Sequence, residues 1–462
     1  MKKKNVIGSV SSSRREFVKK SAIGAAAIMA GCSPKMAETV TESATAAPAA
    51  GAVLGANDRI QVGFIGVGGQ GFNSHVRNVV NLNDDGTPRH DTELNALPVA
   101  AVDVFDRRRE QSLEEMKRVN KDASVYADYR ELLDRDDIDA VFIGAVDHWH
   151  TRIALDALDA GKHVYCEKPM TRYLDEAFQM HDKVKETGLT FQIGSQYCTE
   201  AKWHQAAEMI QAGKIGPLVL AQADYCRNNP DGEWNYEIHP DATPEHIDWN
   251  AWLGPVSDRP FSADEFHRWR KYYPYCAGIL GDLLAHRIHP LLIATGAPEF
   301  PTRVACLGTR QITTDRDVPD NTQVLANFPS GLTIMVIGST VNEQGLEQLI
   351  RGHEGSLYFG GNTVELRPER PFADLVDREQ HSNLEPTVNI PDHIADFFNG
   401  IREDRPTNGN MDLAIRTQVV ISLAEMSERL GEMLYFDEKT RKVSTGSGRE
   451  VKPITYGTLD LS

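Results

Sequence analysis

Hydrophobic and polar positions follow one pattern in the first part of the chain. Short apolar runs stand at 60–65, 97–102, 138–144 and 190–196, and helical segments are predicted at 72–80 and 151–160. Apolar runs of this length without alternation are typical of parallel strands that are buried on both faces. The pattern therefore predicts an N-terminal α/β domain with a doubly wound parallel sheet.

A different pattern begins after residue 196, where strand-like runs follow one another with few helices between them. These runs stand at 218–225, 303–307, 323–328, 332–339, 347–351, 356–359 and 364–367. They predict a C-terminal α+β domain with an open, mostly antiparallel sheet. Late helices are predicted at 392–402 and 412–430. The first domain is one surface on which we expect them to pack.

Length and charge limit the kinds of protein that this chain can be. The chain has 462 residues, and a domain has about 100–200, so two domains with tails are expected. The 66 acidic residues outnumber the 49 basic ones, for a net charge of −17, which disfavours nucleic acid as a partner. The six cysteines form neither a zinc motif nor the dense framework of a disulfide-rich protein.

The first 31 residues have the features of an export signal. Basic residues at 2–4 and 14–15 precede a small, apolar run at 21–31 that is too short to span a bilayer. The sequence 13–19 resembles a twin-arginine signal, and 29–32 resembles the processing box of a bacterial lipoprotein. The resemblance implies cleavage before Cys32, lipidation of Cys32, and a periplasmic protein anchored to a bacterial membrane. The alternative is an ordinary amphipathic N-terminus.

These observations predict five segments. They are a signal at 1–31, a flexible tether at 32–57, an α/β domain at 58–195, an α+β domain at 196–440, and a C-terminal tail at 441–462. The tether is rich in alanine, threonine and proline and has no periodicity.

A glycine-rich sequence follows the first predicted strand directly. Gly66, Gly68 and Gly71 form GxGxxG between that strand and a predicted helix, with Gly69 and Gln70 between the second and third glycines. In this context the glycines permit a tight turn, a close approach of a pyrophosphate, and packing of helix on strand. The sequence therefore predicts a Rossmann dinucleotide site at these five residues.

The second predicted strand ends at Asp103, whose carboxylate can accept hydrogen bonds from the ribose hydroxyls of the adenosine. Because a carboxylate repels a 2′-phosphate, NAD is favoured over NADP. The spacing from Gly71 is longer than the usual 20 or so residues, which we attribute to a polar insertion at 81–95. Three arginines at 107–109 leave some use of NADP open.

A further motif, Glu167-Lys168-Pro169, follows a strand whose carboxyl end lies at the ligand crevice of such sheets. Residues 139–170 resemble the Gfo/Idh/MocA family, named after glucose–fructose oxidoreductase and inositol dehydrogenase, and the resemblance extends over about 57–440. It implies that Lys168 is catalytic and that Pro169 is preceded by a cis bond. We expect Asp147, His150, Glu167, Lys168 and Gln196 to contact the cofactor.

Asp282 and His286 lie four residues apart in a predicted helix, so their side chains are expected on one face. A carboxylate beside an imidazole can orient it and raise its basicity, which would make His286 a general acid or base. The resemblance implies that Lys168, Asp282 and His286 form the catalytic group. Relatives often have glycine at the position of Leu284 and aspartate at that of His289.

Aromatic and basic residues between 234 and 273 can stack on a sugar and hydrogen bond to it, although such clusters more often form core and interface. The cluster contains Trp234, Trp249, Arg268, Trp269, Arg270, Tyr272 and Tyr273. We expect Arg268, Tyr197, His286 and His289 to bind substrate. No metal is expected, because Asp147, His148 and His150 alternate too tightly for one helical face.

The motifs, together with the resemblance, imply an NAD-dependent oxidoreductase that acts on a hydroxyl of a sugar, glycoside or cyclitol, with a tightly bound cofactor. One alternative is a redox-neutral, NAD-dependent glycoside hydrolase or lyase that works through a 3-keto intermediate. Another is a lipid-anchored sugar-binding protein without catalysis. The expected partners are a small carbohydrate or cyclitol, a membrane through the N-terminal lipid alone, and further copies of the chain, since relatives often associate through the second sheet.

Overall fold

The computed structural model describes residues 59–455. The predicted signal at 1–31, the tether at 32–57 and Cys32 lie outside the described residues. Within 59–455, no helix combines the length and the apolar character that a membrane crossing requires.

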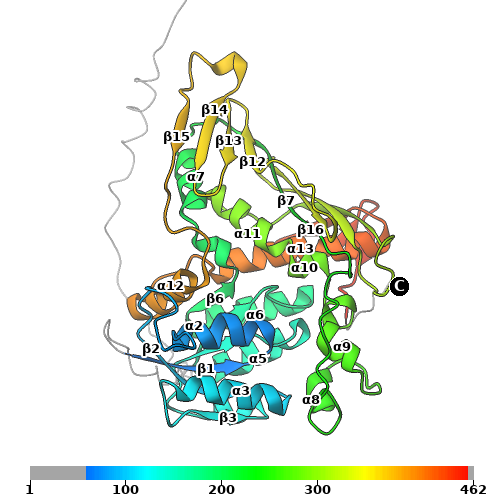
Figure 1. The fold of residues 1–462 in the computed structure, drawn as a ribbon. Helices are drawn as coiled ribbons and strands as arrows, with labels where there is room; N and C mark the ends of the chain where they lie inside the picture. The colour runs from blue at the N-terminus through cyan, green and yellow to red at the C-terminus, as the bar shows by residue number, and fades with distance from the viewer. Residues whose placement is uncertain (1–58, 456–462) are drawn as a thin grey trace, which may run out of the picture. The chain divides into compact units, whose positions relative to one another are not determined.

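The first domain is built on a six-stranded parallel sheet with the order β3-β2-β1-β4-β5-β6 (Figure 1). The strands are β1 (Ile60–Ile65), β2 (Ala96–Val102), β3 (Ser124–Tyr126), β4 (Ala140–Ile143), β5 (His163–Glu167) and β6 (Phe191–Gly194). The order reverses between β1 and β4, and ligands bind at such a switch point, at the carboxyl ends of the strands. The predicted doubly wound parallel sheet is confirmed.

Helices connect these strands and cover both faces of the sheet. They are the π-helix η1 (Gly71–Val76), α2 (Arg77–Val80), α3 (Asp106–Lys117), α4 (Tyr129–Leu133), α5 (Asp147–Asp159) and α6 (Leu174–Thr187). The chain turns at Asn81, which is left-handed, and enters the polar insertion at 81–95 that the sequence predicts.

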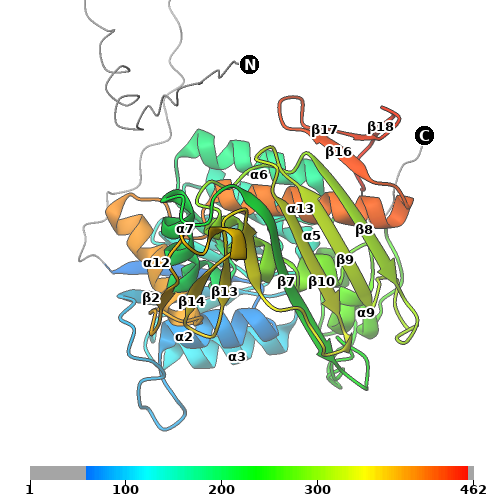
Figure 2. The same cartoon turned by 90° about the horizontal axis from the view of Figure 1, so that it is seen from above.

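The second domain contains a twelve-stranded sheet, whose broad face is seen in Figure 2. Its strands are β7 (Leu218–Asn228), β8 (Arg303–Thr309), β9 (Asn321–Asn327), β10 (Thr333–Ser339), β11 (Val341–Asn342), β12 (Leu349–Gly352), β13 (Gly355–Phe359), β14 (Val364–Pro368), β15 (Glu379–His381), β16 (Leu434–Asp437), β17 (Lys442–Thr445) and β18 (Glu450–Val451). All described neighbours are antiparallel except β7 and β10, so the mostly antiparallel prediction is confirmed.

The prediction of a C-terminal tail from residue 441 is wrong for its first part. Residues 442–451 form β17 and β18, which extend the sheet beyond β16. Val443 and Val451 are buried there. The short strands carry too few apolar residues to stand out as sheet in the sequence, and only their pairing stabilises them.

The helices of the second domain lie between the two sheets and beside the first. They are η2 (Gln196–Thr199), α7 (Ala201–Gln211), α8 (Trp249–Leu253), α9 (Ala263–Arg268), η3 (Trp269–Lys271), α10 (Ile279–Asp282), α11 (Ala285–Ala294), η4 (Arg370–Phe372), α12 (Ile390–Glu403) and α13 (Met411–Leu430). Both late helices return to the first domain. Phe397 and Phe398 of α12 pack in one apolar cluster with β1, and α13 packs on α6.

A buried ion pair joins α13 to the first domain. Arg172, which follows β5, donates two hydrogen bonds to Glu425, at 2.6 and 2.8 Å. The side chains are 1% and 3% exposed. The same guanidinium also donates to the carbonyl of Tyr273. Because both charges are shielded from water, each needs the other to offset its lost hydration.

We expect Glu425→Gln to lower the free energy of unfolding by about 3–5 kcal/mol, because it leaves the charge of Arg172 buried without its counter-ion. Urea denaturation measures this loss. Asp182→Asn is the matched control, since it removes a bidentate but exposed partner of Arg441 and is expected to cost less than about 1 kcal/mol. Equal losses of unfolding free energy in the two variants would contradict the expectation that the buried Arg172–Glu425 pair is more costly to break than an exposed pair.

Candidate functional site

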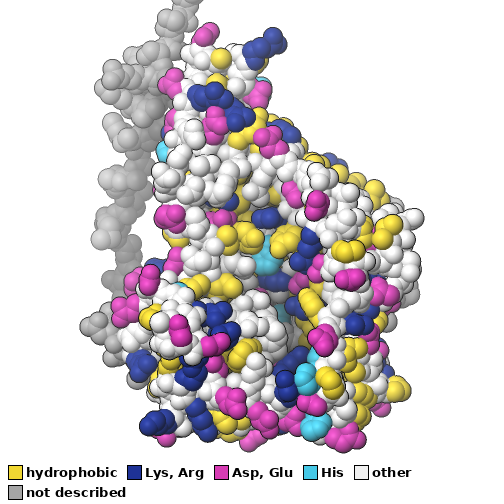
Figure 3. Space-filling view, viewed as in Figure 1, with side chains coloured by type: hydrophobic (Ala, Val, Ile, Leu, Met, Phe, Trp, Pro, Cys, Tyr) yellow, Lys and Arg dark blue, Asp and Glu magenta, His cyan; other side chains and the backbone are white. Residues whose placement is uncertain are grey.

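A cavity of about 870 Å³ opens at the carboxyl ends of β1, β2, β4 and β5. Figure 3 shows this face of the molecule hollowed between the two sheets, with basic and histidine side chains visible in the hollow. The first domain contributes the loops after these strands, and the second contributes residues from β7 to α11. A cavity of this size and position is typical of a ligand site in an open α/β sheet.

The glycine loop forms one wall of the cavity. Gly66 has a φ of +83°, and a Cβ atom there would lie 2.4 Å from the backbone nitrogen of Ala145. A Cβ on Gly71 would lie 2.0 Å from the carbonyl oxygen of Gly66. Gly68, Gly69 and Gln70 line the cavity, whereas Gly71 packs behind it. The loop is therefore closed as tightly as a phosphate-binding turn requires.

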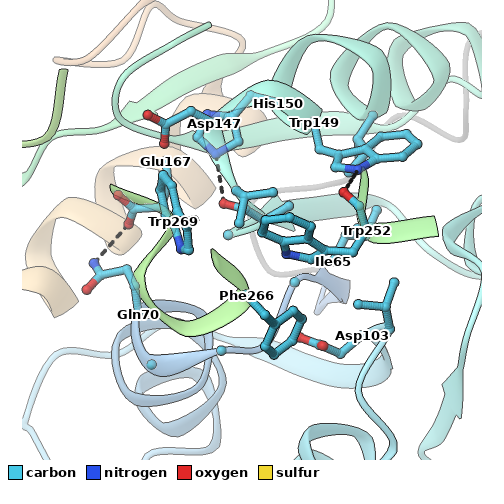
Figure 4. A pocket seen from close by; sticks show the side chains of 18 of the residues that line it. Ile65, Gln70, Asp103, Asp147, Trp149, His150, Glu167, Trp252, Phe266 and Trp269 are labelled. Atoms are coloured by element: carbon cyan, nitrogen blue, oxygen red, sulfur yellow. Dashed lines mark hydrogen bonds between the residues drawn. The ribbon is translucent and has the colours of Figure 1, made fainter. Parts of the chain in front are cut away.

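Asp103 lies in the lining near Phe266, on the opposite side from Glu167 and Gln70 (Figure 4). Its carboxylate accepts hydrogen bonds from the backbone N–H groups of Val67 and Phe105, at 2.9 and 3.0 Å. Arg108 is 3.7 Å away and lies over the ring of Phe266. Asp103 thus ties the loop to β2 and presents a negative group where an adenosine ribose is expected.

Glu167 connects the glycine loop to the end of β5. One of its carboxylate oxygens accepts from Gln70 at 3.0 Å and lies 2.9 Å from the ring nitrogen of His75 (Figure 4 shows the first contact). Burial alone would raise the pKa of Glu167, but the bond and charge of His75 outweigh it and lower the pKa to about 2. Glu167 is therefore an anion that positions its neighbours rather than a proton donor.

Lys168 is held by Asp282 across the boundary between the domains. Its ammonium donates to the side-chain oxygen Oδ1 and to the backbone carbonyl of Asp282, both at 2.7 Å. The same Oδ1 accepts from Nε of Arg270 at 2.9 Å, and Oδ2 accepts from the indole of Trp234 at 2.9 Å. The Lys168–Pro169 bond is cis, as the resemblance implied.

The charges of this cluster stabilise one another. Burial on its own favours a neutral Lys168, but the negative charge of Asp282 outweighs this and raises the pKa of the amine. Burial likewise opposes ionisation of Asp282, and the cations Arg270 and Lys168 reverse the effect, so its pKa is well below the ordinary value. Lys168 is thus an ammonium ion at neutral pH.

His286 also lines the cavity, but not in the way that the sequence predicted. The helix is interrupted at Leu283 and Leu284, between α10 and α11, and Asp282 makes its hydrogen bonds to Lys168, Arg270 and Trp234 instead. Nδ1 of His286 is buried without a hydrogen bond. Burial first, and then the charge of Lys168, keep the pKa of His286 well below its ordinary value. The expected rise in basicity is therefore wrong, and the imidazole is neutral.

Asp147 and His150 line the cavity beside the loop after β4 (Figure 4). Gln196, beyond β6, lines it too. His150 is 3.1 Å from the carbonyl of Ala145 and 2.8 Å from that of Pro169. Burial raises the pKa of Asp147. His148 instead points to the carbonyl of Trp252, at 3.0 Å, so the histidines of this sequence do not converge on one point.

Three predicted substrate residues lie outside the lining of the cavity. Arg268 donates to Asp264 and to the carbonyl of Tyr236. Tyr197 packs edge-on against the ring of His286, at 5.4 Å between centroids, and His289 is buried behind it. Arg270, two residues beyond Arg268, does line the cavity. The sequence feature that could have identified it is its position directly after Trp269 in the aromatic and basic cluster.

A segment of the second domain, residues 229–278, covers the nucleotide end of the cavity, and we call it the strap. It contains α8 and α9, which lie beside the first domain in Figure 1. Its residues Ile247 and Asp248 pair with the chain after Asp103, and the carbonyl of Trp252 accepts from the indole of Trp149 at 2.9 Å (Figure 4). The strap contributes Asn250, Trp252, Phe266 and Trp269, among others, to the lining.

The strap, the glycine loop, Asp103 and the Lys168 cluster together define a class of protein, an oxidoreductase with a dinucleotide site. The loop fits a pyrophosphate because no side chain or Cβ atom fills it, and Asp103 fits a ribose. Residues 60–195 match the family profile described as "Oxidoreductase family, NAD-binding Rossmann fold". Residues 216–450 match "Oxidoreductase family, C-terminal alpha/beta domain". The chain belongs to the Gfo/Idh/MocA oxidoreductase family and has its NAD-binding domain.

Among curated relatives, the chain is 30% identical over 211 residues to an alpha-N-acetylgalactosaminidase of Shewanella oneidensis, which is 43% of each protein. It is 29% identical over 256 residues to a glycosyl hydrolase family 109 protein of Shewanella pealeana, covering 53% of this chain and 54% of that protein. The matched segments thus span about half the length of these relatives.

Solved structures share the fold across most of the chain. An oxidoreductase domain protein from Kribbella flavida has a TM-score of 0.62 at 20% identity, covering 82% of this chain and 100% of its own. Levoglucosan dehydrogenase in complex with NADH and levoglucosan has a TM-score of 0.61 at 19% identity, covering 81% and 99%. An aldose-aldose oxidoreductase from Caulobacter crescentus also has a TM-score of 0.61, at 16% identity, covering 82% and 100%.

Asp282→Asn is expected to lower the pKa of Lys168, because Asp282 is the largest of the influences that raise it. The amine then becomes reactive at a lower pH than in the wild type. Carbamylation of Lys168 by cyanate, followed over pH by peptide mass spectrometry, measures the change. Asp264→Asn, which removes a partner of Arg268 outside the cavity, is the control; an unchanged profile in Asp282→Asn would contradict the assignment.

Proposed function

We propose that this chain is an NAD-dependent oxidoreductase that acts on a hydroxyl group of a sugar, glycoside or cyclitol. The observation that carries the proposal is the pairing of an ammonium ion, Lys168, with a neutral imidazole, His286, in the cavity that the glycine loop also lines. When bound, NAD supplies hydride-accepting chemistry. The described residues supply the binding, the orientation and the proton transfer.

Lys168 and His286 have different parts in this proposal. A neutral imidazole can accept the proton of a substrate hydroxyl, whereas an ammonium ion cannot. Lys168 donates a hydrogen bond to the same oxygen and stabilises the negative charge that develops on it. Asp282 holds the ammonium in place at 2.7 Å. His286 is therefore the base, and Lys168 is the electrostatic stabiliser.

The substrate class is proposed from the nature of the site and of the relatives. Hydroxyl-rich ligands need several donors and acceptors beside aromatic faces, and the cavity offers Tyr225, Tyr236 and Trp269 beside its charged groups. The relatives named above include proteins that act on sugars or were crystallised with them, such as levoglucosan dehydrogenase with L-sorbose.

We also propose that the cofactor stays bound through many turnovers. Support comes from the strap, which is joined to the first domain by Trp149, by Asp106 and by the pairing of Phe105 with Ile247. A bound nucleotide leaves only when these contacts open. A resident cofactor also suits an exported protein, since the periplasm is not expected to supply free NAD.

The first test asks whether the protein holds a cofactor. Protein purified without added nucleotide is denatured, and mass spectrometry then identifies what it releases; we expect NAD or NADH near one per chain.

The second test asks whether the protein oxidises sugars. Sugars and cyclitols are added to the intact protein while nicotinamide absorbance is followed. Lys168→Ala and His286→Gln are each expected to slow reduction by about 10²–10⁴-fold. Lys185→Ala, an exposed lysine on α6, is the control; a wild-type rate in Lys168→Ala would refute the proposal.

The pH dependence of kcat/KM is a second test of whether neutral His286 is the base. Because the pKa of His286 lies well below 6.5, its neutral form persists as the pH falls through 6.5. We expect kcat/KM to stay level down to that pH and to fall only in more acidic solution. A drop centred near pH 6.5 that disappears in His286→Gln would contradict the burial argument.

A second candidate is a redox-neutral glycoside hydrolase or lyase, favoured by the names of the two Shewanella relatives. In that reaction a ketone at C3 acidifies the proton on C2, and a base then removes this proton as the aglycone leaves C1. Water adds to the double bond at C1 and a proton returns to C2. The hydride that leaves C3 when the ketone forms would be held by the bound cofactor and would return to C3, so no net oxidation results. Release of sugar from an aryl glycoside without net NADH would favour it, whereas saturable binding without any turnover would favour a binding protein.

We further propose that the chain is exported by the twin-arginine route and anchored through a lipid on Cys32. The support is the sequence at 13–19 and at 29–32. Expression of the full chain in a bacterium is expected to place it in the membrane fraction, and Cys32→Ala to move it to the soluble periplasmic fraction. Retention of Cys32→Ala in the membrane would contradict a lipid anchor at this residue.

A further inference from the structure

Arg270 presents an unused pair of donors to the cavity. Its Nε atom donates to Asp282 at 2.9 Å, and its guanidinium lies over the ring of Trp269, with 4.1 Å between Cζ and the centroid. No hydrogen bond from Nη1 or Nη2 to a described residue is found, and neither atom is among the buried donors without partners. The side chain is 21% exposed and lines the cavity. The two Nη groups therefore face the space that a substrate fills.

The carboxylate that Arg270 contacts, that of Asp282, also accepts from other donors. Oδ1 of Asp282 accepts from both Lys168 and Arg270, and Oδ2 accepts from Trp234. Lys168 and Arg270 thus share the carboxylate of Asp282, while the negative charges of Glu167 and Asp147 act on Lys168 and Arg270 from further away. A ligand that offers Arg270 a pair of acceptor oxygens therefore meets two Nη donors that Asp282 does not hold.

Two other charged groups that line the cavity, Arg227 and Glu167, have partners of their own. Arg227 pairs with Glu233 at 3.1 Å. Glu167 lies against His75. Asp147 faces Arg270, and burial raises the pKa of its carboxyl, which favours the uncharged form more than in water. Arg108, which also lines the cavity, lies 3.7 Å from Asp103 at the nucleotide end, so Arg270 is the arginine beside Lys168 whose paired Nη donors are left for a ligand.

We propose that Arg270 selects substrates that carry a carboxylate, and that the substrate class is a hexuronic acid or a glycoside of one. This inference rests on the proposed function, since it names the substrate of the same site. A carboxylate matches the planar fork of a guanidinium with two parallel hydrogen bonds, whereas a hydroxyl can use only one donor at a time. Lys168 and His286 then act on a hydroxyl of the same sugar ring.

The test compares two pairs of probes, D-glucuronate with D-glucose and D-galacturonate with D-galactose. Isothermal titration of the full chain with its bound cofactor measures affinity without requiring turnover. We expect at least one uronate to bind about ten- to a hundredfold more tightly than its neutral partner. Arg270→Gln is expected to remove that preference, and Arg270→Lys, which keeps the charge but not the fork, to retain only part of it.

Arg259→Gln is the matched control, because Arg259 is another arginine of the strap and lies outside the cavity. Thermal unfolding of each variant shows whether it is folded. Equal affinity for uronate and neutral sugar in the wild type, or an unchanged preference in a folded Arg270→Gln, would overturn the inference. Preference for D-glucose 6-phosphate over D-glucuronate would also overturn it.

Failure of the inference and failure of the proposed function give different results. Suppose that neutral sugars reduce the bound cofactor and that Arg270→Gln slows this reduction equally for charged and neutral sugars. The oxidoreductase function is then supported, and the selectivity for uronates is refuted. If uronates bind selectively but no sugar reduces the cofactor, the selectivity for uronates is supported and the oxidoreductase function is refuted.

Discussion

Asp282 is a buried carboxylate that accepts hydrogen bonds from Lys168 of the first domain and from Arg270 and Trp234 of the second. Each of these groups comes from a different part of the chain. Each gives up hydrogen bonds to water on burial, and the carboxylate of Asp282 supplies the hydrogen bond that replaces them. The same contact keeps Lys168 charged and sets the direction of its ammonium group. Burial, and then the charge of Lys168, keep the pKa of His286 below its ordinary value, so the contact with Asp282 sets the charge of Lys168 and burial mainly sets that of His286.

The cavity exists only because the two domains are held together. The glycine loop and Asp103 would form an open crevice in the first domain alone, and the strap closes it with Trp252, Phe266 and their neighbours. The pair formed by Arg172 and Glu425 and the packing of α12 and α13 hold the second domain against this crevice. Enclosure strengthens every charge interaction inside and slows exchange of a bound nucleotide.

The chain is similar in sequence to two Shewanella proteins named as glycosidases, over about half their length, and similar in fold to a solved dehydrogenase. A common fold positions a dinucleotide at the switch point of the sheet, but the reaction depends on the groups opposite to it. In this protein those groups are a neutral imidazole, an ammonium ion and a guanidinium with free donors. The broad face of the second sheet also carries exposed apolar side chains, Leu307 and Leu325, on neighbouring strands.

The sequence by itself determined the parallel sheet, the run of antiparallel strands, the glycine loop and the position of Lys168, because these follow from local periodicity and short motifs. The tertiary structure alone decided what Asp282 touches. Helical spacing placed it beside His286, but the break at Leu283 turned it toward Lys168 and Arg270. It also decided that Arg270 rather than Arg268 enters the cavity, and that residues 442–451 join the sheet. Such contacts depend on packing between segments far apart in the chain, which local patterns do not encode.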